Sequence, residues 1–252
     1  MGPRTVATMD GVRWLVHIVA MTPELATLLI ATWTFVLGHF LLSSLPVRGA
    51  LIPKIGVGGH RALYSAAALG TLAWVVVAYG DARMANAYLW DAPGWAAMIP
   101  VAVMPFTGIL FVCSVTSRNP TAVGGERLLS DPSPVGGIMT ITRHPMMVGF
   151  ALWAAAHIPA NGDGASLILF GGMLVLSVGG MLHIDHRRAR LGGDWGPIAL
   201  TTSIIPFAAA LQGRTKVDWA GIGLWRPAAG LILYVALIYG HPWFAGVAII
   251  PH

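Results

Sequence analysis

Charged residues are scarce in this sequence. Asp, Glu, Lys and Arg together make up only 10% of the 252 residues, whereas soluble domains carry about 25%. A soluble chain of this length could not cover its surface with so few charges. Hydrophobic residues make up 56% of the chain and the mean hydropathy is +0.72. Several apolar runs reach about 20 residues, the length that spans a bilayer. The composition therefore predicts an all-α, polytopic membrane protein.

Other absences exclude several classes of site. The single cysteine, Cys113, rules out an intramolecular disulfide framework and a cysteine-rich zinc or iron–sulfur centre. It lies in an apolar run, so we expect a buried, unreactive thiol. Neither a G-x-x-x-x-G-K-[ST] nor an H-E-x-x-H motif occurs. Acidic residues fall almost wholly outside the apolar runs, which weakens a proton-coupled transporter as an interpretation.

The apolar runs predict a helical bundle with about six transmembrane helices plus one short interfacial or re-entrant helix. The expected spans are 23–45, 62–79, 94–115, 145–159, 165–184 and 227–250. Thr22 followed by Pro23 predicts the N-cap and first position of the first helix. The run at 198–211 is only 14 residues long, too short to cross a bilayer, and we interpret it as the short additional helix.

Basic residues are grouped between the apolar runs. The net charge is +5, and 12 of the 15 Lys and Arg residues lie in four segments: 46–61, 116–144, 185–197 and 212–226. The positive-inside rule places such segments in the cytoplasm, which puts both chain ends outside if 198–211 does not cross. This distribution favours a multi-pass protein of the bacterial inner (cytoplasmic) membrane over a nucleic-acid-binding protein.

Histidine is the main candidate for chemistry, because ionisable side chains at membrane depth are costly and often functional. His39 lies deep in the first predicted span, beside Gly38. His144 follows Arg143 in "TITRHPMMVGF" and stands where Pro145 begins the fourth span. Each histidine could instead be an ordinary hydrogen-bonded residue or helix cap. As functional groups, a neutral imidazole could ligate a metal or haem iron, and Arg143 with the helix start could hold an anionic cofactor group.

The remaining histidines give weaker signals. His60 precedes a predicted helix and is expected at the surface. His183, Asp185 and His186 could form a metal site, but the neighbouring arginines would repel a dication, so a solvated helix end is the preferred interpretation. His157 stands near the far end of the fourth span.

Four stretches together resemble the NnrU family, a bacterial membrane family named from denitrification gene clusters and related to plant zeta-carotene isomerase. They are "GHFLLSSLPVR", "GHRALYS", "GIMTITRHPMMVGFALWAAAH" and "HIDHRRARLGGDW". The resemblance covers essentially 21–250. It implies about six membrane helices and, in the isomerase branch, haem b bound through histidines and isomerisation of a cis double bond in a carotenoid. By position, His39 and His144 match the haem ligands, and Arg143 would pair a haem propionate or steady the helix entrance.

Two further functions remain open at this stage. Within the resemblance, a haem protein could act in nitric-oxide handling or denitrification rather than as an isomerase. The R-H-P-x-x-x-G pattern, here Arg143 to Gly149, also resembles membrane methyltransferases and sterol reductases that bind a nucleotide-type cofactor. Those families usually add a Glu-rich motif near the C-terminus, which the corresponding stretch with Asp185 and Trp195 lacks.

The expected domain organisation is simple. We interpret residues 1–20 as an N-terminal extension, possibly an upstream-start artefact, and residues 21–252 as a single NnrU-like transmembrane domain. The expected partners are membrane lipid and an apolar polyene or nitric oxide, with no nucleic acid.

Overall fold

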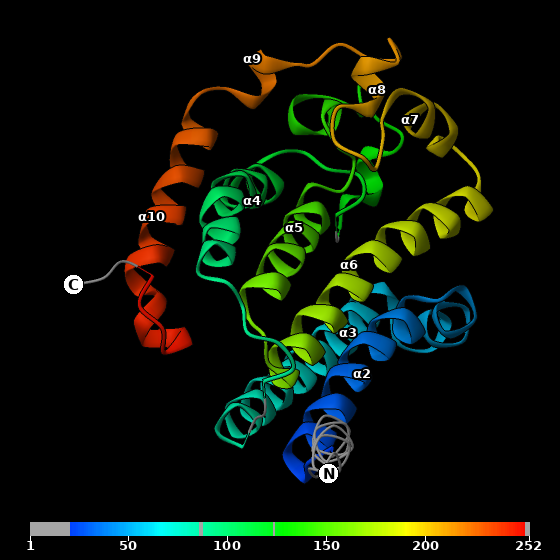
Figure 1. Cartoon of the computed structure of the whole chain (residues 1–252). Coiled ribbons are helices and arrows are strands. Elements are labelled where there is room, and N and C mark those ends of the chain that lie inside the picture. The colour runs from blue at the N-terminus through cyan, green and yellow to red at the C-terminus, as the bar shows by residue number, and fades with distance from the viewer. Residues whose placement is uncertain (1–20, 86–87, 123, 250–252) are drawn as a thin grey trace, which may run out of the picture. The chain divides into compact units, whose positions relative to one another are not determined.

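The computed structural model describes residues 21–85, 88–122 and 124–249, and these residues are almost entirely helical (Figure 1). The predicted extension 1–20 lies outside the described residues. By its contacts the chain divides into two compact units. Unit 1 comprises the residues up to Pro93 together with Ile158–Gly172, and unit 2 comprises Gly94–His157 together with the residues from Met173 onward. The single domain predicted for 21–252 stays a prediction.

Five helices in the described part are long and apolar enough to cross a membrane, which confirms a polytopic helical membrane protein. They are α2 (Pro23–Ser43), α3 (Leu45–Met84), α4 (Met98–Thr116) with the short helix η1 (Gly94–Ala97) before it, α6 (Gly164–Leu191) and α10 (Trp225–Ala245). The remaining predicted span corresponds to α5 (Pro145–Ala160), which is apolar but has only 16 residues.

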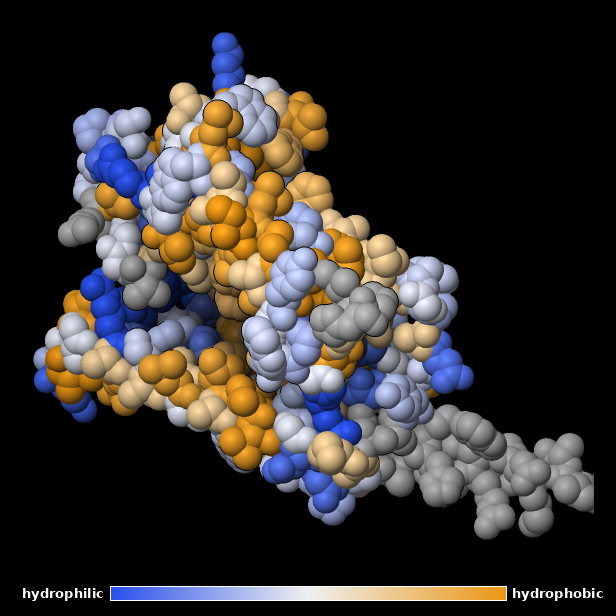
Figure 2. Space-filling model, turned by 90° about the vertical axis from the view of Figure 1, so that its left-hand side faces the viewer, coloured by the Kyte–Doolittle hydropathy of each residue, from blue (hydrophilic) through white to orange (hydrophobic). Residues whose placement is uncertain are grey.

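The surface of α10 shows why these helices require lipid. Only 6% of its most apolar window is buried within the protein. Ile232 is 70% exposed and Trp243 is 89% exposed. Figure 2 shows the face on which α10 lies, where apolar side chains prevail and hydrophilic ones gather toward the edges. In water such a surface would be strongly unfavourable, whereas in a bilayer it is the expected covering of a spanning helix.

In unit 1, α2 and α3 form an antiparallel pair. The hydroxyl of Thr22 accepts a hydrogen bond from the backbone N–H of Leu25, and Pro23 stands at the first turn, as predicted. Helix α3 contains a kink at Gly56, whose φ of 70° is readily adopted only by glycine. Beyond the kink, α3 runs back along α2. Tyr79 of α3 also contacts Ser166 of α6, with 3.1 Å between their hydroxyl oxygens.

In unit 2, α4 and α10 also pack antiparallel, and α5 and the later part of α6 complete the unit. The core combines α4, α5 and α6 with the short helices η3 (Gly137–Thr140) and α9 (Trp219–Ile222). Its buried members are Leu110, Cys113, Ile138, Ile141, Val148, Met181 and Ile222. Cys113 is fully buried, as the sequence predicts. Another short helix, η2 (Gly125–Leu128), lies in the loop after α4.

The segment 198–211 does not form a membrane-spanning helix. It contains most of α7 (Trp195–Thr201) and all of α8 (Ala208–Leu211), separated by non-helical residues. These residues pair with the stretch before α5, since the N–H of Arg143 donates to the carbonyl of Ser203 at 3.0 Å and the N–H of Phe207 to that of Ile141 at 2.9 Å. The segment therefore packs against the backbone that leads into Arg143 and His144.

Candidate functional site

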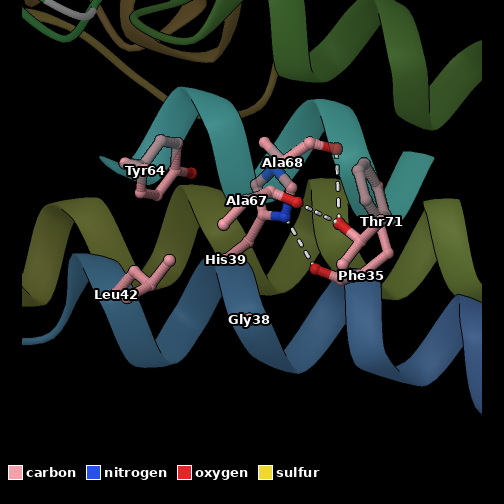
Figure 3. A pocket seen from close by; sticks show the side chains of 8 residues that line it. All are labelled: Phe35, Gly38, His39, Leu42, Tyr64, Ala67, Ala68 and Thr71. Carbon is pink, nitrogen blue, oxygen red and sulfur yellow. Dashed lines mark hydrogen bonds between the residues drawn. The ribbon is translucent and has the colours of Figure 1, made fainter. Parts of the chain in front are cut away.

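The first candidate site is a pocket in unit 1 between α2 and α3. Apolar side chains and His39 form its walls (Figure 3). The lining residues are Phe35, Gly38, His39, Leu42, Tyr64, Ala67, Ala68 and Thr71. Residues 35, 38, 39 and 42 recur at helical spacing on one face of α2, and the others do so on α3. Because Gly38, Ala67 and Ala68 are small, they leave room between the helices.

The ring of His39 has a defined orientation. Its Nδ1 lies 2.7 Å from the carbonyl oxygen of Phe35, one turn earlier on α2. A carbonyl can only accept, so Nδ1 carries the proton and the neutral ring keeps its lone pair on Nε2. The ring reaches from α2 toward Ala67 and Ala68 of α3 (Figure 3). Tyr64 contacts it edge to face, with 5.4 Å between the ring centroids. His39 thus presents an electron pair to a largely apolar pocket.

His60 lies close to this pocket but is not at the surface, so its sequence-based prediction is wrong. The side chain is 2% exposed, and its Nε2 donates to the carbonyl of Leu42 at 3.0 Å. The cause is the kink at Gly56, which turns α3 back along α2 and brings the ring against the end of α2. The sequence pattern shows a glycine-rich stretch before His60 but not the direction in which it bends.

The second candidate site is a buried polar cluster in unit 2. Arg143 and His144 both contact Asp185 of α6. Nε and Nη2 of Arg143 lie 2.9 and 2.7 Å from Oδ2 of Asp185. Nε2 of His144 lies 2.8 Å from Oδ1 of the same carboxylate. His144 is almost fully buried, and the side chains of Arg143 and Asp185 are 13% and 17% exposed. One carboxylate therefore joins both residues of the Arg-His pair.

Backbone and hydroxyl groups from two further segments, one around Thr121 and one at 202–204, complete the cluster. Nη1 of Arg143 donates to the carbonyl of Thr202 at 3.0 Å. The hydroxyl of Thr121 donates to the carbonyl of Arg143 at 2.7 Å, and that of Thr142 to the carbonyl of Ile204 at 2.8 Å. Since all three guanidinium nitrogens of Arg143 donate within the protein, this side chain stabilises the cluster rather than reaching outward for an anionic group.

A further carboxylate, Asp218, fixes the stretch that leads into this cluster. Its Oδ2 accepts from the N–H of Gly137 and its Oδ1 from that of Gly221, each at 2.8 Å. The two backbone N–H groups hold the pKa of Asp218 below its usual value because they stabilise the charged form. Its own N–H donates to the hydroxyl of Thr140 at 3.0 Å. Asp218 thereby connects α9 to η3, three residues before Arg143.

The structure thus brings Arg143 and His144 together with Asp185, while His39 belongs to the other unit. The sequence did not identify Asp185 as their partner, because it lies 41 residues after His144 and resembled a solvated helix end. The only available signal was that a buried arginine needs a counter-ion. The metal site considered for His183, Asp185 and His186 does not form: the carboxylate faces Arg143 and His144, and no cluster of three metal-ligating side chains exists among the described residues.

These features define a class, a multi-pass helical membrane protein with a histidine in an apolar pocket and a second histidine held by an Arg–Asp pair. The chain belongs to the NnrU family, whose model, described as NnrU protein, matches residues 27–249.

Two curated relatives are similar in sequence to about three quarters of the chain. The chain is 30% identical over 197 residues to the chloroplastic 15-cis-zeta-carotene isomerase of Arabidopsis thaliana. The aligned region covers 77% of this chain and 52% of the relative. It is 27% identical over 194 residues to the enzyme of the same name from Zea mays, with 75% and 52% covered. The chain spans about half the length of these relatives. No solved structure matches it.

Proposed function

We propose that this protein is a membrane-embedded isomerase that converts a cis double bond of an apolar polyene to trans, with haem b as its cofactor and His39 as an iron ligand. The resemblance to two enzymes named 15-cis-zeta-carotene isomerase supports the reaction class. The observation that carries the site assignment is His39, an oriented neutral imidazole in an apolar pocket between two membrane helices.

The hydrogen bonding of His39 fits the role of an iron ligand. Histidines that ligate a metal usually donate the other ring N–H to a carbonyl or carboxylate, which fixes the tautomer and strengthens the ligand. His39 has this arrangement, with Phe35 as the acceptor. His144 has it too, with Asp185 as the acceptor. That His144 is the second ligand remains a proposal from the sequence, since the two histidines lie in separate units.

The contacts of Arg143 favour one of the two roles that the sequence suggested for it. Its guanidinium donates to Asp185 and Thr202, so in this proposal it steadies the helix entrance, the other role that the sequence suggested. The same contacts disfavour the alternative in which Arg143 binds a nucleotide-type cofactor of a methyltransferase or reductase.

Within this proposal the chain's residues bind and orient the reactants. Bound haem would supply an iron centre that perturbs the π system and lowers the barrier to rotation about the double bond. The walls of the pocket, including Phe35, Leu42 and Tyr64, are largely apolar and suit a hydrocarbon substrate. His39 would hold the iron through Nε2, because its Nδ1 donates to the carbonyl of Phe35. Isomerisation changes neither the atom count nor the net oxidation state of the polyene, so no co-substrate is needed.

The protein would act in the bacterial inner membrane, with membrane lipid around its exposed helices and the apolar polyene as substrate. The test is to purify the protein in detergent from haem-replete cells, record its oxidised and reduced spectra, and incubate it with 15-cis-zeta-carotene. A Soret band and trans product are expected. A colourless preparation would contradict the proposal. A haem protein that leaves the polyene unchanged but binds nitric oxide when reduced would favour nitric-oxide handling or a role in denitrification instead.

A further inference from the structure

We propose that Gly38 of α2 and Ala68 of α3 are the specificity-determining residues of the pocket, because their small size holds open a slot beside His39 that takes the flat hydrocarbon chain of the substrate. The slot is the part of the pocket that lies between Gly38 on one helix and Ala67 and Ala68 on the other. It belongs entirely to unit 1. The identity of the substrate rests on the proposed function, whereas the shape of the slot does not.

Two aromatic neighbours and one hydrogen bond occupy much of the space around the His39 ring. Phe35 contacts the ring edge to face with 4.3 Å between the centroids, and Tyr64 does so at 5.4 Å. Nδ1 donates to the carbonyl of Phe35. The ring reaches from α2 toward Ala67 and Ala68, as Figure 3 shows. The approach to Nε2 is therefore bordered by small side chains.

Gly38 lines the same pocket and faces open space. A Cβ added to it would meet no atom of a neighbouring segment within 4 Å in the part of the chain that the structure describes. Its backbone is helical and does not have a positive φ. Glycine is less favourable than alanine inside a helix, so neither packing nor backbone conformation explains a glycine at this position. A ligand that occupies the space beside Gly38 does explain it.

The walls define the chemical class of this ligand. None of the eight lining residues is Asp, Glu, Lys or Arg. The hydroxyl of Thr71 donates within α3, to the carbonyls of Ala67 at 2.7 Å and Ala68 at 3.2 Å. A polar ligand would lose hydrogen bonds to water in this slot without replacing them, whereas a hydrocarbon loses none. A conjugated chain is also planar, and it therefore suits a space between two packed helices better than a bulky ligand does.

The test uses the full-length protein in detergent and two variants, Gly38→Leu and Ala68→Leu, which fill the slot from opposite helices. Gly70→Leu is the matched control, because Gly70 is exposed on α3, does not line the pocket and also has open space at its Cβ. The probe is 15-cis-zeta-carotene, an achiral polyene that acquires circular dichroism only when it is held in an asymmetric site. Titration of this induced signal measures the affinity.

Both slot variants should bind the polyene more weakly, by roughly 10- to 100-fold, the effect expected from overpacking. Gly70→Leu should bind it as the native protein does. Thermal denaturation separates a blocked slot from a damaged fold: Gly38→Leu should melt no earlier than the native protein, since its added Cβ meets no neighbour and leucine favours a helix. If Ala68→Leu does not fold, Gly38→Leu decides alone.

Two results would overturn the inference. One is native-like affinity for the polyene in a folded slot variant. The other is an equal loss of affinity in Gly70→Leu, which would show that the effect does not come from the slot. A native protein that gives no induced signal with the polyene would contradict the proposed function instead.

Discussion

Arg143 binds Asp185 through two nitrogens at once, Nε at 2.9 Å and Nη2 at 2.7 Å from the same oxygen. Both side chains are largely buried, so this is not a solvated surface pair. The positive-inside rule alone would treat Arg143 as a topological charge. Its contacts show instead that it is a structural part of the cluster that holds His144.

The first prediction concerns the two hydrogen bonds from the guanidinium group of Arg143 to Asp185. Arg143→Lys retains the charge but cannot reproduce the two contacts to Asp185 and the one to Thr202. We expect a loss of about 2 kcal/mol of stability, the typical contribution of a hydrogen bond to a charged group. Thermal denaturation in detergent measures this. Arg118→Lys is the matched control, because its side chain is 64% exposed and pairs with Asp131 at the surface, where ion pairs contribute little. Equal melting of the two variants would contradict the assignment.

The second prediction concerns the contact between α4 and α10. A Cβ added to Gly230 would lie 2.5 Å from Cα of Ile109, which is backbone and cannot rotate away. Gly230→Ala should therefore force the helices apart and cost about 1–3 kcal/mol, as overpacking usually does. Gly240→Ala on the same helix meets only an ordinary contact at 3.5 Å to Phe244 and serves as the control. Similar denaturation temperatures for both variants would show that the close crossing is absent.

The third prediction concerns pH. The pKa of Asp218 is lowered in the folded protein by the N–H groups of Gly137 and Gly221. A carboxylate with a lowered pKa stabilises the fold fully above its unfolded pKa of about 4. This stability is lost as the pH falls through the lower folded value. Asp218→Asn should therefore denature more easily than the native protein at pH 7, and the difference should shrink below about pH 4. A difference that stays constant with pH would exclude this role for the carboxylate.

The fourth prediction concerns topology. Positive charges and the spans place position 216 in the cytoplasm and position 84 outside. Cys113 is fully buried, so single new cysteines can be labelled against a low background. Lys216→Cys should react with a membrane-impermeant maleimide only after permeabilisation of intact cells, and Met84→Cys should react before it. Labelling of both variants in intact cells would mean that 198–211 crosses the membrane, and labelling of Lys216→Cys alone would mean that the whole chain has the opposite orientation.

The sequence predicted the fold more fully than the site, and the reason is physical. Apolar length and the Thr22–Pro23 cap are local signals, and both the long helices and the cap form where they were expected. The failure of 198–211 to form a spanning helix was also predictable from its length. The partnership of Asp185 with His144 depends on how the end of α6 folds back on a loop 41 residues earlier, which no local pattern contains. The burial of His60 depends likewise on the bend at Gly56.

In the proposed function, His39 holds the group that isomerises the polyene. His39→Ala removes the oriented Nε2 but leaves the walls of the pocket, so the fold should persist while haem and turnover are lost. His186→Ala is the control, because His186 is an exposed histidine at the end of α6.

The most direct measurement is the conversion of 15-cis-zeta-carotene by the reduced, haem-loaded protein, followed by chromatography, with both variants in parallel. Trans product is expected with the native protein and with His186→Ala, and only the uncatalysed rate with His39→Ala. Native-like turnover by His39→Ala, or no turnover by a haem-loaded native protein, would rule out this role for His39.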